Sequence, residues 1–257
     1  MTKINEKNFS TKNSKSESDV IDFYDKYAKT WDSRFGNSFS TNHFLYRRWR
    51  SFEDAIKLSS PHRGLAVELG VGTGVYISKV SSYFDKIVAV DGSQKMLDEL
   101  DKKIHDYGIK NISLIQSNAL DVRDISEDSV DCVYFFGLIE HIVDVKKFIE
   151  EIRRMLKNNG IVIGVTPNGS SPWYSLRKIL RGTGKHCSTD KYYTANDLDS
   201  YFEVAGFKRI YTDQWGAVPA GLSDLIAKPL SKAEVFLERS PIKKYLGGLT
   251  FGYKLIK

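Results

Sequence analysis

The sequence predicts an α/β fold, in which a parallel sheet carries helices on both of its faces. Two observations indicate this class. Short apolar segments alternate with amphipathic segments of helical spacing between residues 61 and 212. Strands separated by helices in this way form parallel sheets that are covered on both sides. The length of 257 residues suits one such domain with additions.

The elements can be placed along the chain from their patterns. Runs rich in β-branched and aromatic residues predict strands, and apolar residues on one stripe predict helices, with Ser93 and Thr194 as N-caps. The predicted strands are 65–69, 86–90, 112–116, 130–136, 161–165, 207–212 and 249–256, and the predicted helices are 20–31, 42–58, 93–107, 145–156 and 194–204.

Composition limits the cellular compartment and the classes of partner expected for the chain. Residues 1–19 are polar, without periodicity or an apolar core segment, which predicts a disordered arm and no secretory signal. The chain has two cysteines, Cys132 and Cys187, so a disulfide framework is not expected. This cysteine content fits a reducing cytoplasm, which is the expected location. The net charge of +6 fits an anionic substrate, nucleic acid or a membrane surface, and does not choose between them.

A glycine-rich turn follows the first predicted strand. The stretch VELGVGTGVYISKV contains Gly70, Gly72 and Gly74, where bare backbone and a helix N-terminus favour an anionic or closely approaching ligand. Dinucleotides and S-adenosylmethionine (SAM) both use this geometry. Val75 replaces the third glycine of the dinucleotide pattern, and the carboxylate of Glu68 suits a ligand with an ammonium and a sulfonium. Asp91, after the second strand, can accept ribose hydroxyls of either ligand.

Five stretches in this order resemble the class I SAM-dependent methyltransferases, and in particular the small-molecule branch that includes ubiquinone-biosynthesis O-methyltransferases. The similarity covers roughly residues 60–212, with a weaker echo in FYDKYAKTWD near the N-terminus. The matching stretches are VELGVGTG, IVAVDGSQKML, SNALDV, SVDCVYFFGLIEHI and RRMLKNNGIVIGVTPN.

The resemblance implies a Rossmann-like, seven-stranded, mostly parallel sheet with an antiparallel last strand. The expected organisation is a disordered arm at 1–19, an N-terminal helical lid at 20–60 and a methyltransferase domain at 61–257. Substrate-side insertions are expected at 169–193 and 214–246, the second being a C-terminal inserted segment.

The resemblance also implies SAM as cofactor, with S-adenosylhomocysteine as product. The glycine turn is placed under the methionine part with Glu68 supporting the loop, Asp91 at the ribose, and Asn118 at the adenine edge, where many relatives have Asp. Tyr27 and Trp31 are expected either to close over the cofactor or to pack their helix onto the sheet. The implied cofactor residues are Tyr27, Trp31, Glu68, Gly70, Gly72, Gly74, Asp91, Asn118, Ala119, Phe136 and Gly137.

His141 is the candidate catalytic residue. It follows the fourth strand in the IEH tripeptide and suits a base for a hydroxyl acceptor, although relatives carry Glu-His here irrespective of acceptor, so a packing role is the favoured interpretation. We expect no metal, because Gly137 stands where the ubiquinone relatives have Glu. Arg47 or Arg50 can be placed at the methionine carboxylate, or on a solvated helix face.

The expected activity is methyl transfer to a small molecule at oxygen. The alternatives are an RNA or protein methyltransferase, an NAD(P)-dependent oxidoreductase and a SAM-binding protein without catalysis. FFGL replaces the motif of base-methylating enzymes, so no nucleic acid is expected. The basic, aromatic segment 169–193 suits an anionic or sugar-linked acceptor, or is a solvated loop. Packing of an inserted subdomain is favoured over membrane contact for 222–246.

Overall fold

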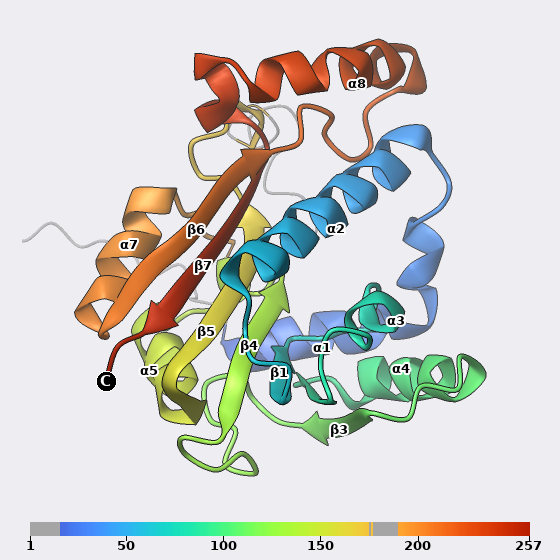
Figure 1. The fold of residues 1–257 in the computed structure, drawn as a ribbon. Helices are drawn as coiled ribbons and strands as arrows, with labels where there is room; N and C mark the ends of the chain where they lie inside the picture. Colours follow the sequence, from blue (N-terminus) through green and yellow to red (C-terminus); the bar gives the residue numbers. More distant parts are fainter. Residues whose placement is uncertain (1–15, 175, 177–189) are drawn as a thin grey trace, which may run out of the picture.

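One seven-stranded sheet organises the molecule (Figure 1), in the order β3-β2-β1-β4-β5-β7-β6. The computed structural model describes residues 16–174, 176 and 190–257. All neighbouring strands pair in parallel except β7, which is antiparallel to both β5 and β6. The predicted fold class and antiparallel last strand are therefore confirmed. The strands are β1 Leu65–Leu69, β2 Lys86–Asp91, β3 Ile112–Gln116, β4 Val130–Phe136, β5 Leu156–Pro167, β6 Phe207–Trp215 and β7 Gly248–Leu255.

The helices begin where their capping residues predict. Ser93 Oγ accepts a hydrogen bond from the backbone N–H of Met96, and Thr194 Oγ1 accepts one from Asp197 N–H. The main helices are α1 Glu17–Tyr27, α2 Phe39–Ser59, α3 Ile77–Val80, α4 Gln94–Asp106, α5 Val145–Met155, α7 Ala195–Val204 and α8 Asp224–Glu238.

The core lies on both faces of the sheet, and β4 shows how the alternation divides it. Val133 and Phe135 pack into the cluster that contains residues of α5 and α7. Cys132 and Tyr134 point to the other face, where α2 packs through Trp49 and Phe52. Cys132 is a buried free thiol.

The N-terminal helix starts earlier than its apolar stripe indicates. It begins at Glu17, ahead of Val20, and the Asp19 carboxylate accepts a hydrogen bond from Ser16 N–H, so that polar residues extend the helix by capping its first turn. No residue of α1 is buried. Most of the arm expected at 1–19, and residues 177–189 of the expected basic segment, lie outside the described residues.

The C-terminal insertion forms α8 and a 3₁₀ helix at Pro241–Tyr245. Ala227 and Glu234 are the buried residues of α8, and the helix packs on α2, where Glu234 contacts His43 and Arg47. Within the described part of the chain, no helix combines the length and apolar character that crossing a bilayer requires.

Candidate active site

A cavity of about 810 Å³ opens at the carboxyl ends of the parallel strands. Glu68, Asp91 and Phe136 line it from the ends of β1, β2 and β4, and residues of α1 and α2 line it from above the sheet. Ligands of open α/β sheets bind at this edge, outside the strand ends. The topology therefore gathers the sequence motifs around one cavity.

The three glycines of the turn after β1 have different surroundings. All three have positive φ, +64° at Gly70, +56° at Gly72 and +68° at Gly74, which L residues rarely adopt. A Cβ on Gly70 or Gly74 would lie 2.7 Å from Leu138 or 2.4 Å from Leu100, whereas one on Gly72 meets no atom within 4 Å. Gly70 and Gly72 line the cavity and Gly74 does not. Gly72 is thus the position with bare backbone toward open space.

Asp91 is fixed beside this turn by backbone amides. Its Oδ2 accepts a hydrogen bond of 2.8 Å from Gly72 N–H, and its Oδ1 accepts one of 2.8 Å from Ser93 N–H. Burial raises the pKa of Asp91 in spite of these hydrogen bonds. Each oxygen keeps a second lone pair, so the carboxylate can still accept hydroxyl donors from the cavity.

Glu68 is a buried carboxyl on the cavity wall. The residue is 4% exposed, and its Oε2 has no hydrogen-bond partner among the described residues. Burial raises the pKa of Glu68 to about 8, opposed by the neighbouring Tyr134 hydroxyl and by the charge of Arg48, while the charge of Asp91 adds to the effect of burial. A cation placed against this oxygen would restore the ionised form, so the wall can bind an ammonium group.

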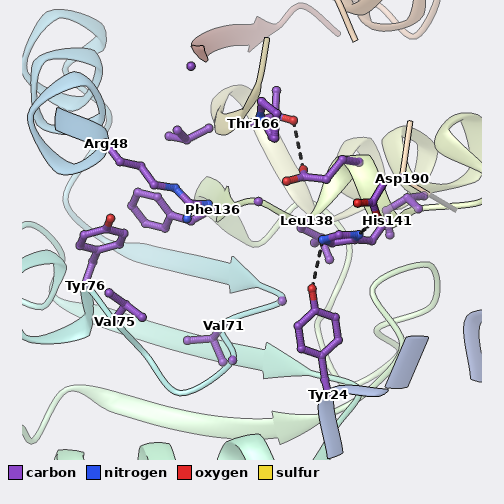
Figure 2. Close-up of a pocket in the computed structure, with 18 of the residues that line it drawn as sticks. Tyr24, Arg48, Val71, Val75, Tyr76, Phe136, Leu138, His141, Thr166 and Asp190 are labelled. Carbon is purple, nitrogen blue, oxygen red and sulfur yellow. Dashed lines mark hydrogen bonds and ion pairs between the residues drawn. The ribbon is translucent and has the colours of Figure 1, made fainter. Parts of the chain in front are cut away.

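Arg48 is a cavity residue that the sequence did not single out. It extends from α2 across the Phe136 ring (Figure 2), with its guanidinium carbon 5.6 Å from the ring centroid. Gly137 has a φ of +66°, which favours glycine there, and a Cβ on it would lie 2.5 Å from Arg48 Nη2. No ion pair is formed by Arg48 within the described chain. Its position one helical turn before Phe52, on the buried stripe, is a signal that could have identified it.

The two arginines considered from the sequence form ion pairs away from the cavity. Arg47 pairs with Glu234 and Glu238 of α8, and Arg50 pairs with Glu53 on its own helix at 2.7 Å. Neither residue lines the cavity.

His141 stands between two oxygen-bearing side chains (Figure 2). Its Nδ1 is 2.9 Å from Asp190 Oδ1, and its Nε2 is 3.0 Å from the Tyr24 hydroxyl of α1. Burial lowers the pKa of His141, but the hydrogen bond to Asp190 and the charges of Glu140 and Asp190 outweigh it, so the pKa is raised. All three residues of this chain, Tyr24, His141 and Asp190, line the cavity.

The remaining predicted positions are divided. Asn118, Ala119, Gly137 and Trp31 line the cavity, and Tyr27 does not; its ring faces the Arg34 guanidinium at 4.5 Å. The Asn118 amide makes two hydrogen bonds, because its Nδ2 donates to Glu17 and its Oδ1 accepts from Leu120 N–H, and it keeps a second N–H and a second lone pair.

Aromatic side chains line the cavity on the β6–β7 side of the sheet, away from Asp91 and Asn118 at β2 and β3. Trp173, Tyr174 and Tyr192 line it together with Trp215, and the Tyr174 and Tyr192 rings lie 4.7 Å apart. Tyr174 donates a hydrogen bond to Gly247 C=O. Across the described residues, no three His, Cys, Asp or Glu side chains are grouped so that they could hold a metal ion.

Comparison with known proteins gives a consistent result. A family model described as a methyltransferase domain matches residues 67–164. The chain is 27% identical over 188 residues to a ubiquinone biosynthesis O-methyltransferase of Bradyrhizobium diazoefficiens, covering 68% of this chain and 70% of that protein. It is 29% identical over 218 residues to a demethylmenaquinone methyltransferase of Lactobacillus johnsonii, covering 76% of this chain and 86% of that protein.

Solved structures show the same fold. DhpI in complex with S-adenosylhomocysteine superposes with a TM-score of 0.62 at 16% identity, covering 93% of this chain and 96% of that one. A Haemonchus contortus N-methyltransferase, in complex with phosphomonomethylethanolamine and S-adenosylhomocysteine, superposes with a TM-score of 0.65 at 17% identity. The match covers 93% of this chain and 60% of that one.

Proposed function

This chain belongs to the class I SAM-dependent methyltransferases, and from that premise we propose that it methylates a small-molecule acceptor at oxygen. It is an enzyme, and its cofactor is SAM. The atom methylated, the acceptor class, the roles of the site residues and a cytoplasmic location are parts of the proposal.

The residues on the cavity wall fit the cofactor. The unpartnered Oε2 of Glu68 would receive the ammonium group, and the unpaired guanidinium of Arg48 would receive the carboxylate of the methionine part. Asp91 would hold the ribose hydroxyls, and the open space at Gly72 would admit the chain between them. Asn118 and Ala119 would lie at the adenine edge. Bound SAM supplies an electrophilic methyl group on a sulfonium.

Transfer to a hydroxyl is supported by the arrangement around His141. Asp190 accepts the Nδ1–H hydrogen bond, which leaves Nε2 as the basic nitrogen. With Nδ1 protonated in this way, the Tyr24 hydroxyl, 3.0 Å from Nε2, would donate its hydrogen bond to Nε2, and both residues line the cavity. We assign the acceptor proton the path from the acceptor oxygen to the Tyr24 oxygen, while the Tyr24 proton moves to His141 Nε2.

The acceptor itself is proposed to bind at the aromatic end of the cavity. Trp173, Tyr174 and Tyr192 line the cavity there, and aromatic side chains suit a planar or apolar molecule with one reactive hydroxyl. The segment at 20–60 is proposed as a lid, because Tyr24 and Arg48 reach the cavity from α1 and α2. These features favour a small acceptor over a macromolecule.

The test is a turnover assay with SAM carrying an isotope-labelled methyl group and a panel of phenols, catechols and amines. We expect methylated oxygen, identified by mass spectrometry, together with S-adenosylhomocysteine. His141→Gln and Tyr24→Phe should each lower turnover by about 10²–10⁴, the usual contribution of general base catalysis. Affinity for S-adenosylhomocysteine should be unchanged in His141→Gln. Methylation of amines alone, or full activity in both variants, would refute the proposal.

A further inference from the structure

Helix α8 presents apolar side chains to solvent. Leu225 is 87% exposed and Phe236 is 75% exposed, and Ile226 and Val235 flank them with more than half of their surface accessible. Leu225, Lys232 and Phe236 are separated by whole turns of the helix, so they lie along one line on its outer face. Solvent-facing apolar residues grouped in this way indicate a contact with a partner.

The inner face of the same helix is acidic. Buried Glu234 is 2.6 Å from His43 Nε2 and 3.3 Å from Arg47 Nε of α2, and its Oε1 accepts a hydrogen bond from Ala217 N–H. Glu238 is paired with Arg47. The helix therefore turns its carboxylates toward the protein and its apolar side chains away from it, the reverse of a helix that packs on a core.

The charges left on the outer surface are nearly all positive. Lys228, Lys232 and Arg239 are exposed beside the apolar line, and Lys244 follows in the 3₁₀ helix. Asp224 is the acidic residue of α8 that is not held against α2, and it lies 3.9 Å from Lys228. Apolar side chains flanked by lysines and arginines are complementary to an anionic lipid surface, where the rings and aliphatic chains enter the headgroup region.

The position of α8 connects this surface to the cavity. The helix lies beyond the carboxyl end of β6 (Figure 1), which is the edge of the sheet at which the cavity opens. The connection from β6 to α8 lines the cavity through Gly216, Val218 and Pro219. A membrane against α8 would therefore lie next to the acceptor end of the cavity.

We propose that the outer face of α8, formed by Leu225, Ile226, Lys228, Lys232, Val235, Phe236 and Arg239, docks on an anionic lipid bilayer. Docking is peripheral, because the face lies on the surface of a folded domain. It depends on both the apolar line and its basic flank, and it does not depend on which atom of an acceptor is methylated.

The test is co-sedimentation of the full chain with vesicles of phosphatidylcholine, with and without phosphatidylglycerol. We expect partition onto the anionic vesicles and little onto phosphatidylcholine alone. Lys228→Gln with Lys232→Gln should lower the partition coefficient by roughly 30-fold, from about 1 kcal/mol for each basic residue near such a surface. Leu225→Ser with Phe236→Ser should remove the partition.

The matched controls are Lys146→Gln on α5 and Val204→Ser at the end of α7. Lys146 and Val204 are exposed, and Val204 lies beyond the opposite end of β6. They should bind vesicles as the unchanged chain does, and all variants should keep its thermal unfolding temperature and its affinity for S-adenosylhomocysteine. Failure of the unchanged chain to partition overturns the proposal. The proposal is also overturned if the chain binds no lipid and instead forms a homodimer or a protein complex that is lost in the Leu225→Ser, Phe236→Ser variant.

Discussion

At the scale of single residues, the ionisation of His141 depends on a neighbour far along the chain. Asp190 is 49 positions away and contacts Nδ1, and its hydrogen bond and charge oppose the effect of burial on the pKa of His141. Neutral imidazole accepts the proton in the proposed reaction, so activity should rise as pH rises through this raised pKa.

Asp190→Asn removes the carboxylate charge and should lower the pKa of His141. The rising limb of turnover against pH should therefore move to lower pH, and maximal turnover should fall because the imidazolium is less stabilised. Glu150→Gln, an exposed change on α5, serves as the control and should leave the limb in place. A limb that stays fixed in Asp190→Asn would show that another group titrates.

Glu68 offers a second test through its proton. With a pKa of about 8 the carboxyl is protonated near neutral pH, and binding of an ammonium against Oε2 favours the ionised form. S-adenosylhomocysteine should therefore release a proton as it binds at pH 7. Calorimetry in two buffers of different ionisation enthalpy measures this release, which Glu68→Gln should abolish. Equal release in the variant would assign the proton to a different group.

The sequence identified the residues whose position is set locally. Asp91 is the last residue of β2, and Gly72 and His141 lie within five residues of the ends of β1 and β4, so the strand ends place them at the cavity. Arg48, Tyr24 and Asp190 were not identified, because the rotation of α2 and α1 and the fold of the chain near residue 190 are set by tertiary packing. Arg48 was passed over for Arg47 and Arg50, although Arg48 shares the stripe of buried Phe52.

At the scale of elements, the turn from β1 to α3 combines a ligand position with a packing position. Gly72 faces open cavity, whereas a Cβ on Gly74 would collide with Leu100 of α4. Both have positive φ, so both carry the same backbone strain when substituted, on the order of 1–2 kcal/mol. Substitutions at these two glycines therefore distinguish an effect on ligand binding, expected at Gly72, from an effect on stability, expected at Gly74.

Gly72→Val should abolish binding of S-adenosylhomocysteine and lower stability only by the backbone strain. Gly74→Val should lower the unfolding temperature much further, because it adds overpacking against Leu100 and Ile77. Thermal unfolding and calorimetry on both variants compare the two effects. Wild-type affinity in a folded Gly72→Val protein would contradict the assigned position of the ligand.

Element boundaries were predictable where the pattern is local. The strand ends were located to within three residues, except that β5 begins at Leu156, five residues before the predicted start at 161. Ser93 and Thr194 began their helices as expected. The insertion at 214–246 was not assigned a helix, because Pro229 and an apolar surface directed to solvent break the usual relation between periodicity and burial.

At the scale of the whole molecule, α1 lines the cavity, makes polar contacts with its neighbours and buries none of its own residues. Glu17 accepts from Asn118, Asp25 accepts from Ser93, and Tyr24 contacts His141. Contacts of this kind exchange readily with water, so α1 is expected to open at lower free energy than the core helices.

Binding of S-adenosylhomocysteine should slow hydrogen exchange in residues 17–27, because a ligand in the proposed position would add contacts to α1, from which Tyr24 lines the cavity. Exchange in α7, which is anchored by buried Leu198 and Phe202, is the internal control and should change little. Mass spectrometry of peptic fragments gives both rates. Unchanged exchange in α1 would exclude it as the lid.

Helix α2 carries consecutive arginines with opposite orientations. Arg47 faces Glu234 and Glu238 of α8, and Arg48 faces the cavity. If lipid at α8 displaced α2, it would also move Arg48, the proposed ligand of the methionine carboxylate, and the two proposed sites would then be thermodynamically linked. Linkage is reciprocal: the factor by which anionic vesicles change the affinity for S-adenosylhomocysteine must equal the factor by which S-adenosylhomocysteine changes the affinity for vesicles.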